Sequence, residues 1–435
     1  MNAMRFSSTR EAANAAGFSA ALQQGLAPDG GLFVPASWPA TPAVLPSQSL
    51  DLASLAERLL APFLAADPLA GELSAITREA FSFPAPLVTL DADARLSLLE
   101  LFHGPTAAFK DFGARFLAGS LARLPRAGGR SLNMLVATSG DTGGAVAAAF
   151  HERPGMQVTV LFPKGLVSPT QERQLTCWGG NVASFAVRGR FDDCQRLAKE
   201  ALQAPDLRAR FDLSSANSIN LGRLLPQMVY YAAASLALYR EHGERAAFII
   251  PSGNLGNAVA CIWARKLGLP IGAIVLAHNA NRTVPDYLQS GQWQPRPSIA
   301  TLASAMDVGN PSNMERLRNL FPAMPELVAA VSADSVDDAA IGLRIRAAFD
   351  DWGKSLCPHT AVAAEVYARL PAVRRRASPW VIVATAHAAK FKEIVEPLTG
   401  EEVPVPESLM RLFARPTACT EIPANLEGLR AALNV

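Results

Sequence analysis

Two glycine-rich loops have the composition of anion-binding sites. The first, residues 137–144, reads ATSGDTGG and leads from an apolar run into a predicted helix over residues 145–151. Glycines let the backbone approach a ligand closely, hydroxyl groups donate hydrogen bonds, and the first N–H groups of a helix lack partners within it. The spacing matches neither the GxGxxG nor the GxxxxGK[ST] nucleotide motif. Taken alone, the loop fits an ordinary capped turn equally well.

The second loop, residues 249–257, reads IIPSGNLGN and runs from a predicted strand into a predicted helix. Its glycines and asparagines could surround a phosphate with backbone amides and without a lysine: Gly253, Asn254, Gly256 and Asn257. Such a loop suits a phosphate that is bound permanently as part of a cofactor. The two loops together therefore indicate a phosphorylated cofactor and an anionic substrate.

Lys110, which follows a strand-like apolar run at residues 98–102, is a candidate nucleophile. Residues 104–106 (GPT) cap a predicted helix whose buried face carries Phe109, Phe112 and Phe116. Lys110 lies off this face, and we expect Gly113 and Ala114 to leave room for a flat ring beside its amine. A helix start and apolar rings lower the pKa of a lysine, which Schiff-base chemistry requires. Most lysines are merely solvated, so only the two loops give Lys110 this interpretation.

The elements that must position these residues have an α/β pattern. Short apolar runs alternate with longer helical patterns, which is typical of parallel sheet. The runs that predict buried strands are residues 134–137, 158–161, 247–250, 274–276 and 381–383. Loops that leave the carboxyl ends of such strands are where ligands bind in open α/β sheets. Residues 51–78 are predicted as a helix that precedes this body.

Composition narrows the function classes. The chain has 435 residues, a net charge of +2 and five scattered cysteines. The length predicts two or three domains, and the charge gives no electrostatic reason to bind nucleic acid or an anionic membrane. The cysteines show neither metal-ligand spacing nor a disulfide framework, so we expect free thiols and no metal. No apolar secretion signal or bilayer span is evident, so a cytoplasmic protein is expected.

These motifs together resemble the threonine synthases, a branch of the fold-type II pyridoxal-phosphate enzymes. The resemblance covers almost the entire chain and begins with residues 8–10 and 25–35, which look like the amino-terminal signature of that branch. Residues 100–106 with 109–111 resemble its lysine motif, and residues 137–143 its ATSGDTG loop. Further matching segments are 161–165 with Gln174, 191–194, 217–220 with Arg223, 226–227, 306–313, 358–361 and 384–387 with 390–391.

The resemblance implies a fold with two open, mostly parallel α/β sheet domains, the cofactor between them, and an N-terminal extension specific to threonine synthases. The extension would cover residues 1–93. A smaller domain over residues 94–225 would carry Lys110 and the 138–143 loop, and a larger domain over residues 226–435 would carry the phosphate loop.

It also implies residue roles. Lys110 would form a Schiff base with pyridoxal 5'-phosphate and move protons, and Thr385 would contact the pyridine nitrogen. The cofactor phosphate would be bound by Gly253, Asn254, Leu255, Gly256 and Asn257. The candidate substrate contacts are Ser139, Gly140, Asp141, Thr142, Lys164, Ser168 and Arg223. Leu255 replaces the more usual phenylalanine, and Cys357 stands where aspartate often precedes Pro-His-Thr.

The implied activity is the conversion of O-phospho-L-homoserine and water into L-threonine and phosphate, the last step of threonine biosynthesis, by a monomer or homodimer. Two alternatives are another fold-type II lyase, such as a dehydratase or a phosphohomoserine lyase, and a non-catalytic phosphate-binding regulator. We expect His359 and His387 to be structural hydrogen-bonding groups. Arg223 fits a salt-bridged helix residue as well as a ligand contact.

Overall fold

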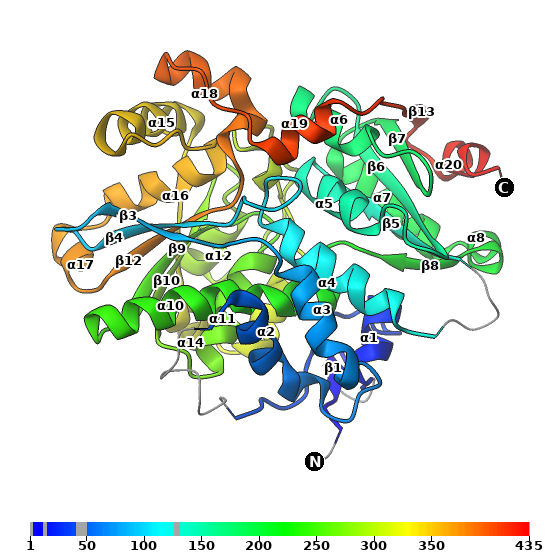
Figure 1. Ribbon diagram of the computed structural model, residues 1–435, viewed down its shortest axis with the longest axis horizontal. Coiled ribbons are helices and arrows are strands. Elements are labelled where there is room, and N and C mark those ends of the chain that lie inside the picture. Colours follow the sequence, from blue (N-terminus) through cyan, green and yellow to red (C-terminus); the bar gives the residue numbers. More distant parts are fainter. Residues whose placement is uncertain (1–2, 12–14, 41–49, 126–130, 435) are drawn as a thin grey trace.

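The computed structural model describes residues 3–11, 15–40, 50–125 and 131–434, which form two large sheets flanked by helices and one small two-stranded sheet (Figure 1). The larger sheet has the strand order β11 (Ser332–Ser335), β10 (Ile271–His278), β9 (Ala246–Pro251), β12 (Trp380–Ala384), β4 (Leu96–Glu100), β3 (Leu87–Asp91). The smaller sheet has the order β13 (Thr420–Pro423), β7 (Val182–Arg188), β6 (Met156–Pro163), β5 (Leu132–Ala137), β8 (Asp212–Ser215). Every neighbouring pair in these two sheets is parallel except β3 and β4. The predicted fold class is confirmed.

The larger sheet is covered by helices on both faces. In β9, Ala247 and Ile249 belong to a core shared with α15 (Asp338–Trp352) and α16 (Pro358–Arg369). Phe248 and Ile250 belong to a second core shared with α10 (Met228–His242) and α11 (Gly256–Lys266). This alternation follows from the pleat of a strand, which turns successive side chains to opposite faces.

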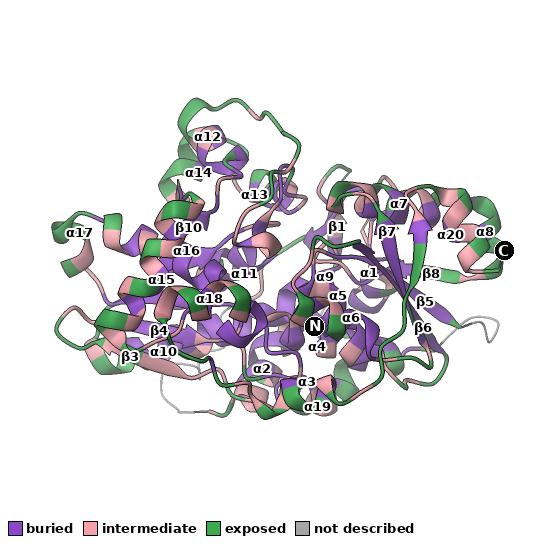
Figure 2. Cartoon of the chain, turned by 90° about the horizontal axis from the view of Figure 1, so that it is seen from above, coloured by how far each residue is buried: buried purple, intermediate pink, exposed green. Residues whose placement is uncertain are grey.

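Because both faces are covered, the strands had to be continuous apolar runs. The five predicted strands correspond to β5, β6, β9, β10 and β12, which are buried along almost their whole length. Figure 2 shows the buried residues along the strands and the exposed ones on outer helices such as α17 (Ala372–Arg376). Among the described helices, none is long and apolar enough to cross a membrane.

The N-terminal region adds a small two-stranded sheet, and its buried side chains belong to the same apolar core as the body of the protein. It pairs β1 (Phe6–Ser8) with β2 (Phe33–Pro35) and adds α1 (Phe18–Gln24). The prediction of one helix over residues 51–78 was wrong. The structure has α2 (Leu52–Leu60) and α3 (Leu73–Ala80), separated by two short 3-10 turns. Pro62 and Pro68 lie in the interruption, where a missing N–H and a ring clash disfavour continued helix.

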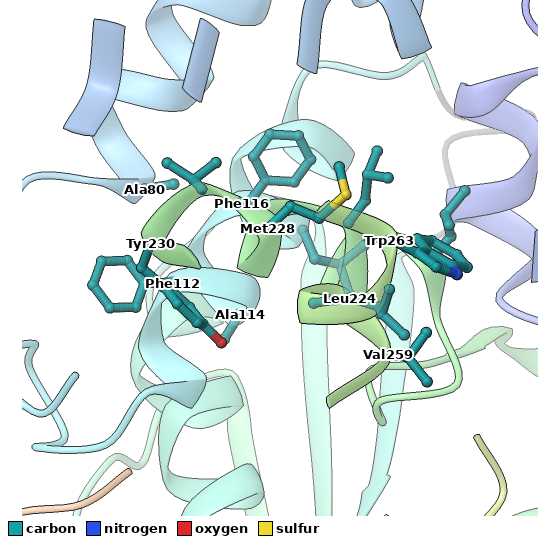
Figure 3. Packing of buried hydrophobic residues seen from close by; sticks show 14 of the residues in the cluster. Ala80, Phe112, Ala114, Phe116, Leu224, Met228, Tyr230, Val259 and Trp263 are labelled. Carbon is teal, nitrogen blue, oxygen red and sulfur yellow. The ribbon is translucent and has the colours of Figure 1, made fainter. Parts of the chain in front are cut away.

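Helix α4 (Lys110–Ala122) joins this region to both sheets through one apolar core (Figure 3). Phe112 and Phe116 are fully buried, as predicted. The ring of Phe112 lies 5.5 Å from that of Tyr230 in α10, and the ring of Phe116 lies 6.4 Å from that of Phe18 in α1. Phe109 precedes the helix and is only half-buried.

Each of the two large sheets contains strands from more than one of the three predicted domains (residues 1–93, 94–225 and 226–435). Strand β4 lies within residues 94–225 yet pairs with β12 in the larger sheet. Strand β13 lies within residues 226–435 yet pairs with β7 in the smaller sheet. The boundaries at residues 93 and 225 stay a prediction about domains, and each sheet is completed by a strand from another segment.

A buried arginine forms hydrogen bonds that connect the N-terminal region to the body of the protein. Arg316 of α13 (Met314–Leu320) is fully buried, and its guanidinium donates to the carbonyl oxygens of Phe33, Ser218 and Ile219 at 3.1, 3.2 and 2.7 Å. It also donates to Oδ1 of Asn313 at 2.6 Å. One side chain therefore satisfies acceptors from three distant parts of the chain.

We expect Arg316→Met to lower the free energy of unfolding by about 3 kcal/mol, because it leaves several buried carbonyl groups without donors. The matched control is Arg411→Met, whose side chain is 75% exposed and forms an ion pair with Glu407. The control should change stability by less than about 1 kcal/mol. Urea unfolding of both variants measures the difference, and equal small effects would contradict the proposed role of Arg316.

Candidate active site

A cavity lies where the carboxyl ends of β5, β9 and β12 meet the start of α4. Its empty volume, including the part open to solvent, is about 900 Å³. The predicted site residues that line it are Lys110, Ser139, Asp141, Thr142, Arg223, Gly253, Asn254, Leu255, Gly256, Asn257 and Thr385. The structure thus brings both predicted anion-binding loops and the candidate lysine to one place.

Three candidate substrate contacts are not in the lining. Lys164 is exposed and forms an ion pair with Glu421. Ser168 caps α6 (Pro169–Thr176), and its hydroxyl donates to a backbone carbonyl at 2.9 Å. Gly140 packs against Gln171, where a Cβ atom would lie 2.5 Å from the side chain. Lys164, Ser168 and Gly140 stay predictions as substrate contacts, and in this structure they lie outside the cavity lining.

The position of Lys110 is set by the backbone around it. Lys110 lies near the start of its helix, as predicted, but α4 begins at Lys110 itself, so residues 104–106 do not cap it and Phe109 precedes it. The N–H of Phe109 donates to the carbonyl oxygen of Thr385 at 2.9 Å, and the N–H of His387 donates to that of Ala107 at 3.1 Å. Ala107 has a φ of 52°, a conformation that non-glycine residues rarely adopt. The turn before α4 is therefore held against the segment after β12.

Burial lowers the pKa of Lys110 to about 8. The Asp141 carboxylate opposes this shift, while the charges of Lys390 and Arg223 add to it. The predicted direction is confirmed. A substantial share of the amine is consequently neutral near pH 8, as a nucleophilic lysine requires.

The prediction that Gly113 leaves room for a ring was wrong. A Cβ atom at Gly113 would lie 2.3 Å from the carbonyl oxygen of Arg223, so this glycine lets α4 and α9 (Leu221–Leu224) approach each other. Ala114 is fully buried in the apolar core. Both small residues serve helix packing, and this packing places Arg223 beside Lys110 in the cavity.

The 253–257 loop has the geometry of an anion site. Leu255 adopts a left-handed conformation with a φ of 63° directly before α11, whose first N–H groups lack partners within the helix. The glycines also allow close packing of loops, since a Cβ atom at Gly253 would lie 2.9 Å from Cα of Met306. At Gly256 the corresponding distance to Cβ of Ser218 is 3.2 Å.

Three buried polar atoms in the lining have no partner among the described residues: Nδ2 of Asn257, Nε of Arg223 and Oδ1 of Asn217. Asn257 uses its other amide atom to accept from the hydroxyl groups of Tyr230 and Tyr231, at 2.5 and 2.8 Å. Since buried polar groups are rarely left unpaired, these atoms indicate that the cavity takes a polar ligand. Two donors and the start of a helix suit an anion.

Asp141 is the acidic residue that lines the cavity, and its carboxylate is ionised. It begins α5 (Asp141–Phe150), is 4% exposed, and accepts from Nε2 of Gln171 at 3.0 Å. Burial would raise its pKa, but the ammonium groups of Lys390 and Lys110 hold that pKa far below its ordinary value. An ionised carboxylate in the lining repels the anionic groups of a substrate. Its favourable electrostatic interactions are with the ammonium groups of Lys110 and Lys390. That Asp141 contacts the substrate stays a prediction, and its charge argues against a contact with the anionic groups of a substrate.

The two histidines are hydrogen-bonding groups, as expected. Nε2 of His359 accepts from the N–H of Ala305 at 3.0 Å, and Nδ1 of His387 accepts from the N–H of Ala389 at 3.1 Å. Burial lowers the pKa of each to about 4, so both rings are neutral at pH 7. His359 lines the cavity. Among the described residues, no group of acidic, histidine or cysteine side chains could hold a metal ion.

Several cavity residues were not among the predicted site residues, among them the polar residues Asn217 and Ser218. Asn217 and Ser218 line the cavity beside Arg223, and Nδ2 of Asn254 donates to Oγ of Ser218 at 2.8 Å. Their motif at residues 217–220 was visible in the sequence, but it follows no strong strand pattern, so nothing placed it at the site. In the structure, Asn217 and Ser218 line the same cavity as the phosphate loop and Lys110.

The fold and cavity define a class: an α/β enzyme that binds a phosphorylated cofactor beside a lysine, between two sheets. Residues 81–386 match the family model for a pyridoxal-phosphate dependent enzyme. Residues 5–81 match the model for the threonine synthase N terminus, and residues 360–433 match the model for the threonine synthase C-terminal region.

Individual relatives agree. The chain is 39% identical to a threonine synthase of Haemophilus influenzae over 96% of both chains. It superposes on the crystal structure of threonine synthase from Escherichia coli with a TM-score of 0.91 and 36% identity, and on the pyridoxal-phosphate-bound threonine synthase of Brucella melitensis with a TM-score of 0.89 and 33% identity, each covering 99% of both chains. The chain belongs to the threonine synthase family of pyridoxal-phosphate enzymes and is a lyase of threonine biosynthesis.

The contact of Gly113 gives a test of the site's packing. Gly113→Ala should push α9 away from α4, displace Arg223 and destabilise the protein by about 2 kcal/mol, as overpacking does. The control is Gly144→Ala in α5, where the added Cβ atom would meet only ordinary contacts, the nearest at 3.4 Å. Thermal unfolding and cofactor affinity should change in the first variant and stay near the parent values in the second. If Gly113→Ala is silent in both measurements, α9 is not held by this contact.

Proposed function

We propose that this chain converts O-phospho-L-homoserine and water into L-threonine and phosphate. The observation that carries the proposal is the lining of one cavity: a lysine of lowered pKa, a helix-start loop for a cofactor phosphate, and a buried arginine with an unpaired donor. A substrate with both a carboxylate and a phosphate requires donors beyond those that hold the cofactor. The cavity provides them on separate elements.

The residues that would hold pyridoxal phosphate fit the group. The N–H groups of Gly253, Asn254, Leu255, Gly256 and Asn257 would bind its phosphate, and the unpaired Nδ2 of Asn257 would add a donor. The hydroxyl of Thr385, which is 6% exposed in the lining, would face the ring nitrogen. The bound cofactor supplies an electron sink for carbanions next to the substrate's amino group.

Lys110 would move the protons. Its lowered pKa lets it accept a proton from Cα of the substrate and deliver one as an ammonium group afterwards. Its neighbour Asp141 stays ionised and balances the charge when Lys110 is protonated. The Asp141 carboxylate would thus stabilise the protonated state of Lys110 each time the amine takes up a proton.

Arg223, with Asn217 and Ser218, would bind the substrate phosphate. Arg223 is 1% exposed, and its Nε has no partner among the described residues. Burial lowers the pKa of Arg223 to about 10, so its guanidinium stays charged at neutral pH. The hydroxyl-bearing residues Ser139 and Thr142 at the opposite loop would receive the substrate carboxylate.

The experiment that tests this function supplies O-phospho-L-homoserine to the purified holoenzyme and quantifies threonine, phosphate and keto acid. The proposal requires equal amounts of threonine and phosphate. Phosphate accompanied by keto acid in place of threonine would identify a phosphohomoserine lyase. We further propose a cytoplasmic location, since all five cysteines are free thiols and four of them are buried.

The lysine assignment predicts a chemical label. Borohydride should abolish the visible absorption of the holoenzyme and fix the cofactor to Lys110, which peptide mapping detects. Lys110→Ala should keep the fold, because the side chain lies off the buried phenylalanine face, and should lose more than about 10³-fold in turnover. The control is Lys266→Ala, at the opposite end of α11 from the phosphate loop. A label on any other lysine would refute the assignment.

The ring-nitrogen assignment predicts a change in product. Thr385→Ser should retain most activity, and Thr385→Ala should weaken cofactor binding by about 1 kcal/mol, the net value of one neutral hydrogen bond. Thr385→Asp should differ in kind, because an anion favours a protonated ring and a stronger electron sink. We expect a higher ratio of keto acid to threonine and a changed absorption spectrum. Parent-like values in Thr385→Asp would mean that Thr385 does not face the ring.

A further inference from the structure

A buried ion pair lies directly behind the cavity. Lys390, in the 3-10 turn η6 (Ala388–Phe391), is fully buried, and its Nζ lies 2.7 Å from Oδ1 of Asp141. The same Nζ donates to the carbonyl oxygen of Thr106 at 2.9 Å. Thr106 belongs to the turn that leads into α4. One ammonium group thus connects three segments that surround Lys110.

The partners of this pair are themselves fixed. The N–H and hydroxyl of Thr106 donate to the two carboxylate oxygens of Asp111, at 2.9 and 2.6 Å. Nε2 of Gln174 donates to the same Thr106 carbonyl at 3.0 Å. Lys390 therefore occupies one defined place in a buried polar network, and it cannot swing into the cavity without breaking these contacts.

Burying an ammonium and a carboxylate is costly, and apolar side chains of similar size often give equal or greater stability. Stability alone is therefore a weak reason for the pair. Asp141 lines the cavity beside Lys110, whereas Lys390 does not line it. Within the ion pair of Asp141 and Lys390, only Asp141 therefore lies in the cavity with Lys110.

The charged groups that face Lys110 come from four elements: Asp141 of α5, Lys390 of η6, Arg223 of α9 and His359 of α16. His359 is neutral because burial lowers its pKa to about 4. The Asp141 carboxylate is thus shared between two ammonium groups, with a guanidinium nearby, and the buried carboxylate of Asp111 also interacts with Lys390 and Arg223. In a site of low dielectric, removing any one of these charges must change the proton affinity of the others.

We propose that Lys390 is a positioning residue whose buried ammonium holds the Asp141 carboxylate in place, and that this ion pair controls the protonation of Lys110. Lys390 neutralises part of the carboxylate that would otherwise stabilise Lys110 as an ammonium. It thereby keeps Lys110 available as a base while Asp141 remains ionised. This inference adds to the proposed role of Lys110 and concerns the amine itself.

The two members of the pair should act in opposite directions. Lys390→Met leaves Asp141 with Lys110 as its nearest cation, so the Lys110 amine should be deprotonated at higher pH. Asp141→Asn removes the carboxylate that faces both ammonium groups, so deprotonation of Lys110 should occur at lower pH. The double variant removes one charge of each sign and should lie between them. A merely structural role would shift neither midpoint, or both in the same direction.

The test uses competitive acetylation of Lys110 as a function of pH, quantified by mass spectrometry, in the full chain freed of cofactor and checked by circular dichroism. Lys390→Met should raise the labelling midpoint by about one pH unit and Asp141→Asn should lower it by a similar amount, each about a tenfold change in reactivity at fixed pH. The control is Lys392→Met, whose partly exposed side chain pairs with Glu396. It should leave the midpoint unchanged.

In the holoenzyme, the pH midpoint of the cofactor absorption should move in the same two directions. Unchanged or parallel shifts in the two single variants would overturn the inference. If Lys390→Met fails to fold, the double variant should have a higher midpoint than Asp141→Asn; if Asp141→Asn fails to fold, the double variant should have a lower midpoint than Lys390→Met. The opposite order in either comparison contradicts the inference. Because labelling reports the Lys110 amine without cofactor, these shifts would stand even if borohydride mapping placed the cofactor on another lysine.

Discussion

The central constraint is that one lysine, Lys110, is buried beside other cations, which makes it lose its proton readily, and must still be able to take a proton up again. Burial lowers the pKa of Lys110 to about 8. The ionised carboxylate of Asp141 opposes this shift, so Lys110 can also be protonated. Such a balance requires charges fixed in position. The structure fixes them by backbone hydrogen bonds between the turn before α4 and the segment after β12.

The need to bring distant loops together explains much of the local backbone. Gly113 admits the carbonyl of Arg223, and Gly253 admits the backbone at Met306. Ala107 and Leu255 accept positive φ values at the two turns that carry the lysine and the phosphate loop. Conformations of this kind cost free energy and persist where the surrounding packing over-determines them, often at functional sites.

The sequence predicted the strands and the loops but not the contacts between them. Buried parallel strands must be continuous apolar runs, and loops at their carboxyl ends must carry turn and hydroxyl residues, so residues 134–137 and 253–257 were identifiable. The role of Gly113 was misjudged because a glycine in a helix does not say which neighbour it admits. Lys390 and Asp141 lie in different segments, and only the packing of η6 against α5 shows that they are a pair.

The most direct test of this account is a crystal structure of the protein purified with its cofactor. We expect continuous electron density from Nζ of Lys110 to the cofactor, its phosphate within hydrogen-bonding distance of the N–H groups of residues 253–257, and Thr385 at the ring nitrogen. Cofactor density joined to a different lysine, or a phosphate bound at the 139–142 loop, would contradict the assignment of the cavity and of the residues that operate it.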